Sequence, residues 1–155
     1  MDATLGRAHS LEGLSAASLD FLRALDRNRH RIAKKANVSA SELRALFRIA
    51  EVVRITPKAL AELLSMTTGA ITAISTRLVE GGLIQRVDNP TDRRSLYLEL
   101  TSAAHLLMEE IHRDFMALIE DSAHVLGARE RAQLTSSLAA LAAELDIRTS
   151  IDPVS

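Results

Sequence analysis

Apolar residues recur at spacings of three and four along most of this chain, which is the period of an amphipathic helix. Long helices are predicted over about 14–35, 101–126 and 128–145, with Gly127 separating the last two. The polar tail from Asp146 onward is expected to fray. The helices at the two ends carry more apolar surface than one small domain needs, and this surplus predicts a homodimer.

Two shorter amphipathic helices are predicted within residues 56–82. Thr56 favours a helix start, because its hydroxyl can accept a first-turn amide and the following Pro57 has no N–H to leave unpaired. Thr67 opens the second helix in the same way, and Gly81 with Gly82 ends it. Two short helices joined by a tight turn form a helix-turn-helix, whose second helix can enter a DNA major groove.

Period-two alternation appears after this unit and predicts a β-hairpin over 83–100. Residues 88–92 are turn formers, so they mark the tip. Arg93 and Arg94 follow the turn, where charge does not serve a core but can reach a DNA minor groove. Before the helix-turn-helix, Ser39 and Glu42 form a capping box that opens another helix, predicted to pack behind it.

The second short helix has few side chains that can form specific hydrogen bonds with DNA bases. Between Thr67 and Thr76 it carries no Arg, Lys, Asn or Gln, so bidentate base contacts are unavailable before Arg77. Specificity is therefore expected to depend on methyl contacts, water and DNA shape. The candidate DNA-contacting residues are Lys58, Thr67, Thr68, Ala70, Thr72, Ala73, Thr76, Arg77, Arg93 and Arg94.

The order of these elements, with the segments GGLIQR and NPTDRR, resembles the MarR family of dimeric bacterial transcription regulators. Asp92, Arg94, Leu100 and Thr101 match the wing motif D-x-R-x5-L-T at every fixed position. Ser65 departs from the pattern, because it stands where many helix-turn-helix sequences have glycine, and a strained serine there is expected to cost some stability.

The resemblance implies a mainly α fold with a small β-hairpin, in one domain over 1–155. The winged helix-turn-helix would span about 39–101, and dimerisation helices would span about 11–36 and 102–146. It implies a repressor of a pseudo-palindromic operator with half-sites about 10 bp apart. One wing arginine would enter the minor groove while Asp92 orients the arginines. It also implies a small-molecule effector, with a candidate pocket lined by Phe21, Asn28, Phe47 and His112.

Composition and charge refine this interpretation. The net charge is −1, but residues 1–100 carry fifteen Arg and Lys against eleven Asp and Glu, whereas residues 101–155 carry four against nine. This asymmetry favours one face for DNA phosphates, the alternative being ordinary solvated helix faces. The chain has no cysteine, which excludes a thiol redox switch. The absence of a signal peptide and of an apolar run long enough to span a bilayer predicts a cytoplasmic protein with no membrane association.

Enzymatic and metal-dependent functions find little support in the sequence. There is no phosphate-binding glycine loop and no catalytic constellation, so an enzyme is not expected. His105 and His112 lie two helical turns apart, too far to share one cation without further ligands, so neither a metal nor a cofactor is expected. The competing function is a winged-helix dimer that binds protein partners without reading DNA sequence. Its best support is the lack of base-contacting polar side chains on the second short helix before Arg77.

Overall fold

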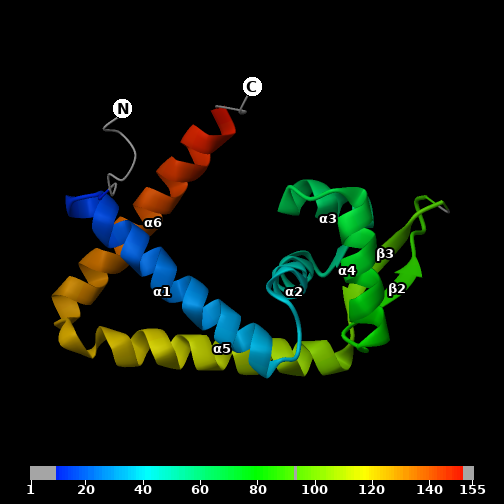
Figure 1. Ribbon diagram of the computed structural model, residues 1–155, viewed down its shortest axis with the longest axis horizontal. Helices are drawn as coiled ribbons and strands as arrows, with labels where there is room; N and C mark the ends of the chain where they lie inside the picture. The colour runs from blue at the N-terminus through cyan, green and yellow to red at the C-terminus, as the bar shows by residue number, and fades with distance from the viewer. Residues whose placement is uncertain (1–9, 93, 152–155) are drawn as a thin grey trace, which may run out of the picture. The chain divides into compact units, whose positions relative to one another are not determined.

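The computed structural model describes residues 10–92 and 94–151, with side chains described through residue 149. The chain forms two compact units, residues 1–111 and 112–155, and Figure 1 labels their helices and strands. The elements in chain order are α1 (Gly13–Lys35), α2 (Ala40–Val52), β1 (Arg54–Ile55), α3 (Pro57–Leu64), α4 (Thr68–Glu80), β2 (Ile84–Asp88), β3 (Leu96–Leu100), α5 (Ser102–Ser122), the 3-10 turn η1 (Ala123–Val125) and α6 (Ala128–Ile151).

Hydroxyl side chains begin the helices where the sequence predicts them. The Oγ of Ser39 accepts from the backbone N–H of Glu42 at 3.2 Å, and the Glu42 carboxylate accepts from the backbone N–H of Ser39 at 2.7 Å. Thr56 and Thr67 each accept a backbone amide three residues on, at 3.2 Å. The predicted capping box and both threonine caps are therefore confirmed, and they fix the starts of α2, α3 and α4.

The turn between α3 and α4 depends on one residue in a left-handed conformation. Ser65 has φ 52° and ψ 46°, and its N–H donates to the Glu62 carbonyl at 3.1 Å. The next amide, of Met66, donates to the Ala61 carbonyl at 2.9 Å. These bonds pair carbonyls that the end of α3 leaves open. The strained serine expected from the sequence is confirmed, because a side chain in this region meets its own backbone.

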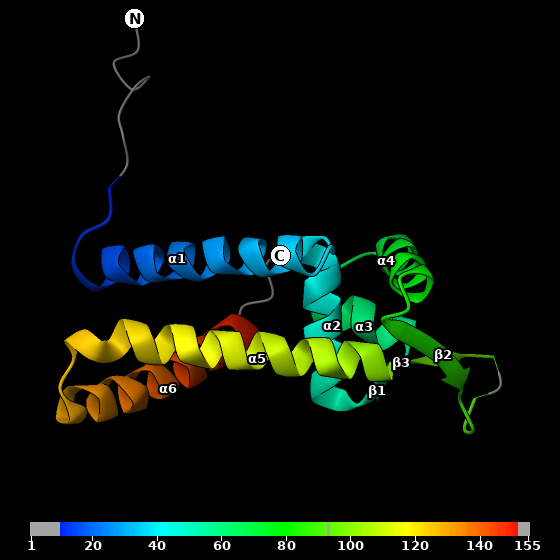
Figure 2. The ribbon, with the colours of Figure 1, turned by 90° about the horizontal axis from the view of Figure 1, so that it is seen from below.

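A three-stranded antiparallel sheet with strand order β1-β3-β2 follows the helix-turn-helix. Strand β3 pairs with β2 from Ile84 opposite Leu100 to Asp88 opposite Leu96, and this is the predicted hairpin. The hairpin projects beyond α4 as a wing in two perpendicular views (Figure 2). The predicted hairpin is confirmed, but the sequence analysis missed β1, which pairs with the outer edge of β3.

The core of the first unit gathers the apolar faces of α2, α3 and α4 against the sheet. Leu43, Leu46 and Ile49 of α2 are fully buried, as are Leu60 of α3 and Ile71 of α4. Side chains of this size each stabilise the fold by about 1.5–3 kcal/mol when they leave water. Helix α2 therefore supports the helix-turn-helix from behind, as the sequence predicts.

The second unit contains the last half of α5, η1 and α6. Gly127 precedes α6 as predicted, but α5 ends at Ser122 rather than near residue 126 because the chain tightens into η1, and α6 continues to Ile151. The expectation that the chain frays from Asp146 is therefore wrong for residues 146–151, since Arg148 donates to the Glu144 carboxylate at 2.6 Å within the same helix. Residues 152–155 lie outside the described residues. Exposed leucines follow one seam of α6 at Leu134, Leu138, Leu141 and Leu145.

Replacing Ser65 by glycine should raise the free energy of unfolding by about 1 kcal/mol, because glycine adopts the left-handed conformation without the Cβ clash. Ser18 in the interior of α1 is the matched control, and Ser18→Gly should instead lower stability by about 0.5 kcal/mol. Urea denaturation at one protein concentration measures both variants. A destabilised Ser65→Gly variant would contradict the strain.

Candidate nucleic-acid interface

Helix α4 leaves one face open because its other face is packed into the core. Ile71, Ile74, Ser75 and Leu78 are buried. The candidate DNA-contacting positions of this helix and its cap are exposed or half-buried: Thr67, Thr68, Ala70, Thr72, Ala73, Thr76 and Arg77. Lys58 is exposed in the first turn of α3. The open face thus contains hydroxyls and methyl groups, which suit close approach to base edges and thymine methyls.

Two of these hydroxyls already bond the helix backbone. Thr67 accepts the Ala70 amide at 3.2 Å, so its oxygen serves first as the cap of α4. The Thr72 hydroxyl donates its proton to the Thr68 carbonyl at 2.9 Å. Because Thr72 is exposed, its oxygen lone pairs and its methyl group remain for contacts with a ligand. The helix therefore offers Thr72 as an acceptor and an apolar contact rather than as a donor.

Arg86 joins this face although sequence reasoning missed it. It lies exposed on β2, and its Nη2 donates to the Thr76 hydroxyl at 3.4 Å, so it links the wing to α4. Strand alternation does not predict this position, because Ile84, two residues earlier on the same face of the strand, is buried against the core.

The wing tip is organised by a buried amide. The side chain of Asn89 is 6% exposed, and its oxygen accepts from the Thr91 hydroxyl at 2.7 Å and the Thr91 amide at 3.0 Å. Its Nδ2 donates to the Ser95 hydroxyl at 2.8 Å. The sequence marks Asn89 as one turn former among five, whereas the structure makes it the centre of the turn.

Asp92 and Arg94, two of the predicted wing residues, follow Asn89 in the wing tip. The Asp92 carboxylate accepts from the backbone N–H of Arg94 at 3.0 Å, so it orders the backbone that carries Arg94. Arg94 is exposed. Arg93, the other wing arginine predicted to contact DNA, lies outside the described residues.

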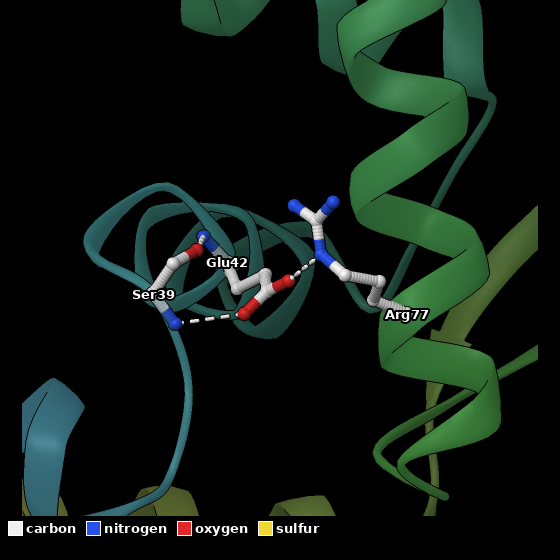
Figure 3. Close-up of polar contacts among 3 residues, drawn as sticks. All are labelled: Ser39, Glu42 and Arg77. Atoms are coloured by element: carbon white, nitrogen blue, oxygen red, sulfur yellow. Dashed lines mark hydrogen bonds and ion pairs between the residues drawn. The ribbon is translucent and has the colours of Figure 1, made fainter.

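Arg77 is bound at the edge of α4 by a carboxylate from α2. Its Nε donates to Glu42, whose other oxygen accepts the Ser39 amide, so one carboxylate joins two helices (Figure 3). The Glu42 side chain is 9% exposed and the Arg77 side chain is 56% exposed. Sequence reasoning assigned Arg77 to DNA and Glu42 to the cap, and did not foresee the bond between them.

The Glu42 carboxyl has a pKa below its ordinary value of 4.5. Burial is the largest single influence and raises the pKa, but hydrogen bonds from Arg77 and from Ser39, with the Arg77 charge, together outweigh it. The carboxylate is therefore ionised near neutral pH, in the form that binds both partners.

Comparisons with known proteins match this geometry. The family model described as "MarR family" matches residues 32–96, which run from the end of α1 into β3. The HTH-type transcriptional regulator FarR of Neisseria gonorrhoeae is 32% identical over 111 residues, covering 72% of this chain and 76% of that protein. The chain belongs to the MarR family.

The multiple antibiotic resistance protein MarR of Escherichia coli is also 32% identical, over 77 residues that span about half of each protein. Its wild-type apo crystal structure resembles this fold with a TM-score of 0.72 and 26% identity, covering 86% of this chain and 98% of that one. A mutant of the same protein complexed with operator DNA matches with a TM-score of 0.56 and 25% identity, covering 84% of this chain and 99% of that one.

The candidate effector residues of this MarR family member fall in both units. Phe21 is exposed on α1, Phe47 is half-buried on α2, and His112 is exposed in the second unit. The Asn28 amide oxygen accepts from Arg31 at 2.9 Å, so this amide already has a partner on its own helix. The effector role of these residues stays a prediction.

In the part of the chain that the structure describes, no cluster of metal-ligating side chains forms. None of the described helices combines the length and the apolar character that a bilayer span requires.

The Glu42 pair should make stability depend on acid pH. Because the folded-state pKa is lowered, the pair stabilises the fold above the ordinary value of 4.5 and loses this effect as pH falls through the folded value. Glu42→Gln should keep the capping box. At neutral pH it should lower the free energy of unfolding by less than about 1 kcal/mol, because Arg77 is largely solvated. Denaturation of both proteins should show this difference shrinking below pH 4.5. A difference that stays constant or grows in acid would contradict the shift.

Proposed function

We propose that this chain is a sequence-specific DNA-binding transcriptional regulator that acts as a homodimer on a pseudo-palindromic operator. The observation that carries the proposal is the open face of α4, whose small side chains and hydroxyls run from Thr67 to Thr76, where Arg86 of the wing bonds and Arg77 follows. A helix with such a face can lie in a major groove while the flanking cations meet phosphates. The operator complex of E. coli MarR supports the same use of the fold.

The dimer is supported by apolar side chains that each unit leaves in solvent. In the first unit Leu14, Phe21 and Leu22 of α1 are between 45% and 69% exposed. The leucine seam of α6 is between 43% and 59% exposed. Exposed apolar seams of this kind on long helices are typical of surfaces that a partner chain covers. Two copies would present two copies of α4 to neighbouring major grooves on one side of DNA, about 10 bp apart.

Repression and its release by a small molecule rest on the resemblance to the family. With no cysteine in the sequence, the release we propose is reversible binding of a ligand rather than thiol oxidation. The working site of such a regulator is the bacterial cytoplasm, where its DNA lies. The competing role is a winged-helix module that binds protein partners, and the absence of long polar side chains on α4 before Arg77 favours it.

Truncating both wing arginines should separate these two roles. Arg93→Ala with Arg94→Ala should weaken binding to every duplex and reduce the slope of log K against log salt by about 0.9 for each phosphate that the variant no longer neutralises. By contrast, Thr72→Leu should mainly change sequence preference, at about 1–3 kcal/mol for the contacted base pair. The measurement is a salt titration on the DNA upstream of the gene and on a random duplex.

The matched control is Arg113→Ala with Arg129→Ala, which removes two exposed arginines from the second unit. This variant should bind DNA like the wild type. If the wild type shows no preference for the upstream DNA and the wing variant binds as it does, the regulator proposal fails. The protein-interaction module then takes its place.

A further inference from the structure

Glu42 meets α4 from a fixed position. One carboxylate oxygen accepts the Ser39 amide at 2.7 Å, and the Ser39 hydroxyl accepts the Glu42 amide at 3.2 Å. Leu43 and Leu46, which follow Glu42 in α2, are fully buried and anchor this part of the helix in the core. The second carboxylate oxygen is therefore presented to α4 by a side chain that has little freedom to move.

Arg77 uses one part of its guanidinium for this contact. Within the described part of the chain its side chain bonds to Glu42 alone, through Nε. The two terminal nitrogens, Nη1 and Nη2, point away from Glu42 (Figure 3). A guanidinium carries five N–H donors in a planar fork, so four of them remain for an acceptor in solvent.

Arg77 lies at the edge of the open face of α4. Ala73, four residues earlier, is exposed, whereas Ile74 and Leu78 are buried. Arg77 thus lies on the border between the open face and the core. It is also the one residue of α4 with a bidentate donor set, because the helix contains no other Arg, Lys, Asn or Gln.

A free arginine on a surface must give up rotamer freedom when it binds, and this ordering weakens the contact. The Glu42 carboxylate removes part of that cost beforehand, because it restrains the side chain in the unbound protein. It also orients the guanidinium plane, which sets the direction of the remaining donors.

We propose that Glu42 is a positioning residue for DNA recognition, which holds Arg77 so that Nη1 and Nη2 meet a pair of acceptor atoms on the duplex. The acceptors are either two phosphate oxygens or O6 and N7 of a guanine, since both present the same paired geometry to a guanidinium. This inference rests on the proposed DNA-binding function and adds a second residue, from outside the recognition helix, to it.

Glu42→Gln tests the proposal because lost positioning and lost negative charge should change the affinity for DNA in opposite directions. Glutamine supports a capping box, so α2 keeps its start, but the side-chain amide no longer offers Arg77 a carboxylate. Removing a negative charge near DNA ordinarily tightens binding. The positioning role instead predicts affinity for the upstream DNA about tenfold weaker, the value of one charge-assisted hydrogen bond. Glu80→Gln, one turn from Arg77 on α4, is the matched control and should bind at least as tightly as the wild type.

A double-mutant cycle tells positioning from a general structural effect. In an Arg77→Ala background, Glu42→Gln should cause no further decrease in affinity, because the arginine that it positions is gone. An equal decrease in both backgrounds would overturn the proposal, as would a Glu42→Gln variant that binds like Glu80→Gln. Urea denaturation of each variant verifies that the fold is retained. If the wild type itself shows no preference for the upstream DNA, the proposed function fails, which is a different result.

Two duplexes identify the acceptor. For phosphate oxygens, Arg77→Ala should reduce the salt slope by about 0.9 for each phosphate that Arg77 neutralises, and should weaken binding to all sequences alike. For a guanine, the slope stays unchanged, and replacing one guanine by 7-deazaguanine should weaken wild-type binding but not binding by Arg77→Ala. Either pattern supports the positioning of Arg77 for a paired acceptor.

Discussion

Burial of one stripe of α4 is the constraint on which the interface depends. Ile71, Ile74 and Leu78 are at most 3% exposed, and together they stabilise the first unit by several kcal/mol, at about 1.5–3 kcal/mol for each side chain. A rotation of α4 would bring these residues into water and place threonines in the core. The apolar stripe therefore decides which side chains face solvent, and the polar groups only refine that choice.

The refinement comes from a few well-placed polar groups. Glu42 binds the edge of α4, Asn89 orders the tip of the wing, and Arg86 joins the wing to Thr76. Each of these contacts crosses between elements or closes a turn, and those of Glu42 and Arg86 are made at the open face of α4 or its edge. The interface is thus built in advance of any ligand, which reduces the ordering that DNA binding requires.

The sequence predicts local features of this fold well. Capping by Ser39, Thr56 and Thr67 joins each hydroxyl to the backbone amide three residues on. Both partners of each hydrogen bond therefore lie within a short stretch of sequence, where a local pattern can predict them. Strand β1 has two residues, Arg54 and Ile55, too few to show alternation, and it exists because β3 offers a free edge.

Other features depend on contacts that no local pattern records. Glu42 and Arg77 are 35 residues apart, and only the packing of α2 against α4 brings them together. Asn89 looks like any turn residue until the burial of its amide is known. The effector residues were inferred from resemblance alone, and they remain predictions.

In the proposed regulator, two copies of α4 read one side of a DNA duplex. Hydroxyl-radical footprinting of the wild-type protein on the DNA upstream of its gene tests this arrangement most directly. A dimer bound in this way should give two protected patches about 10 bp apart on the same side of the DNA helix, related by the pseudo-twofold symmetry of the site. A single patch, or protection that does not differ from that of a random duplex, would contradict it.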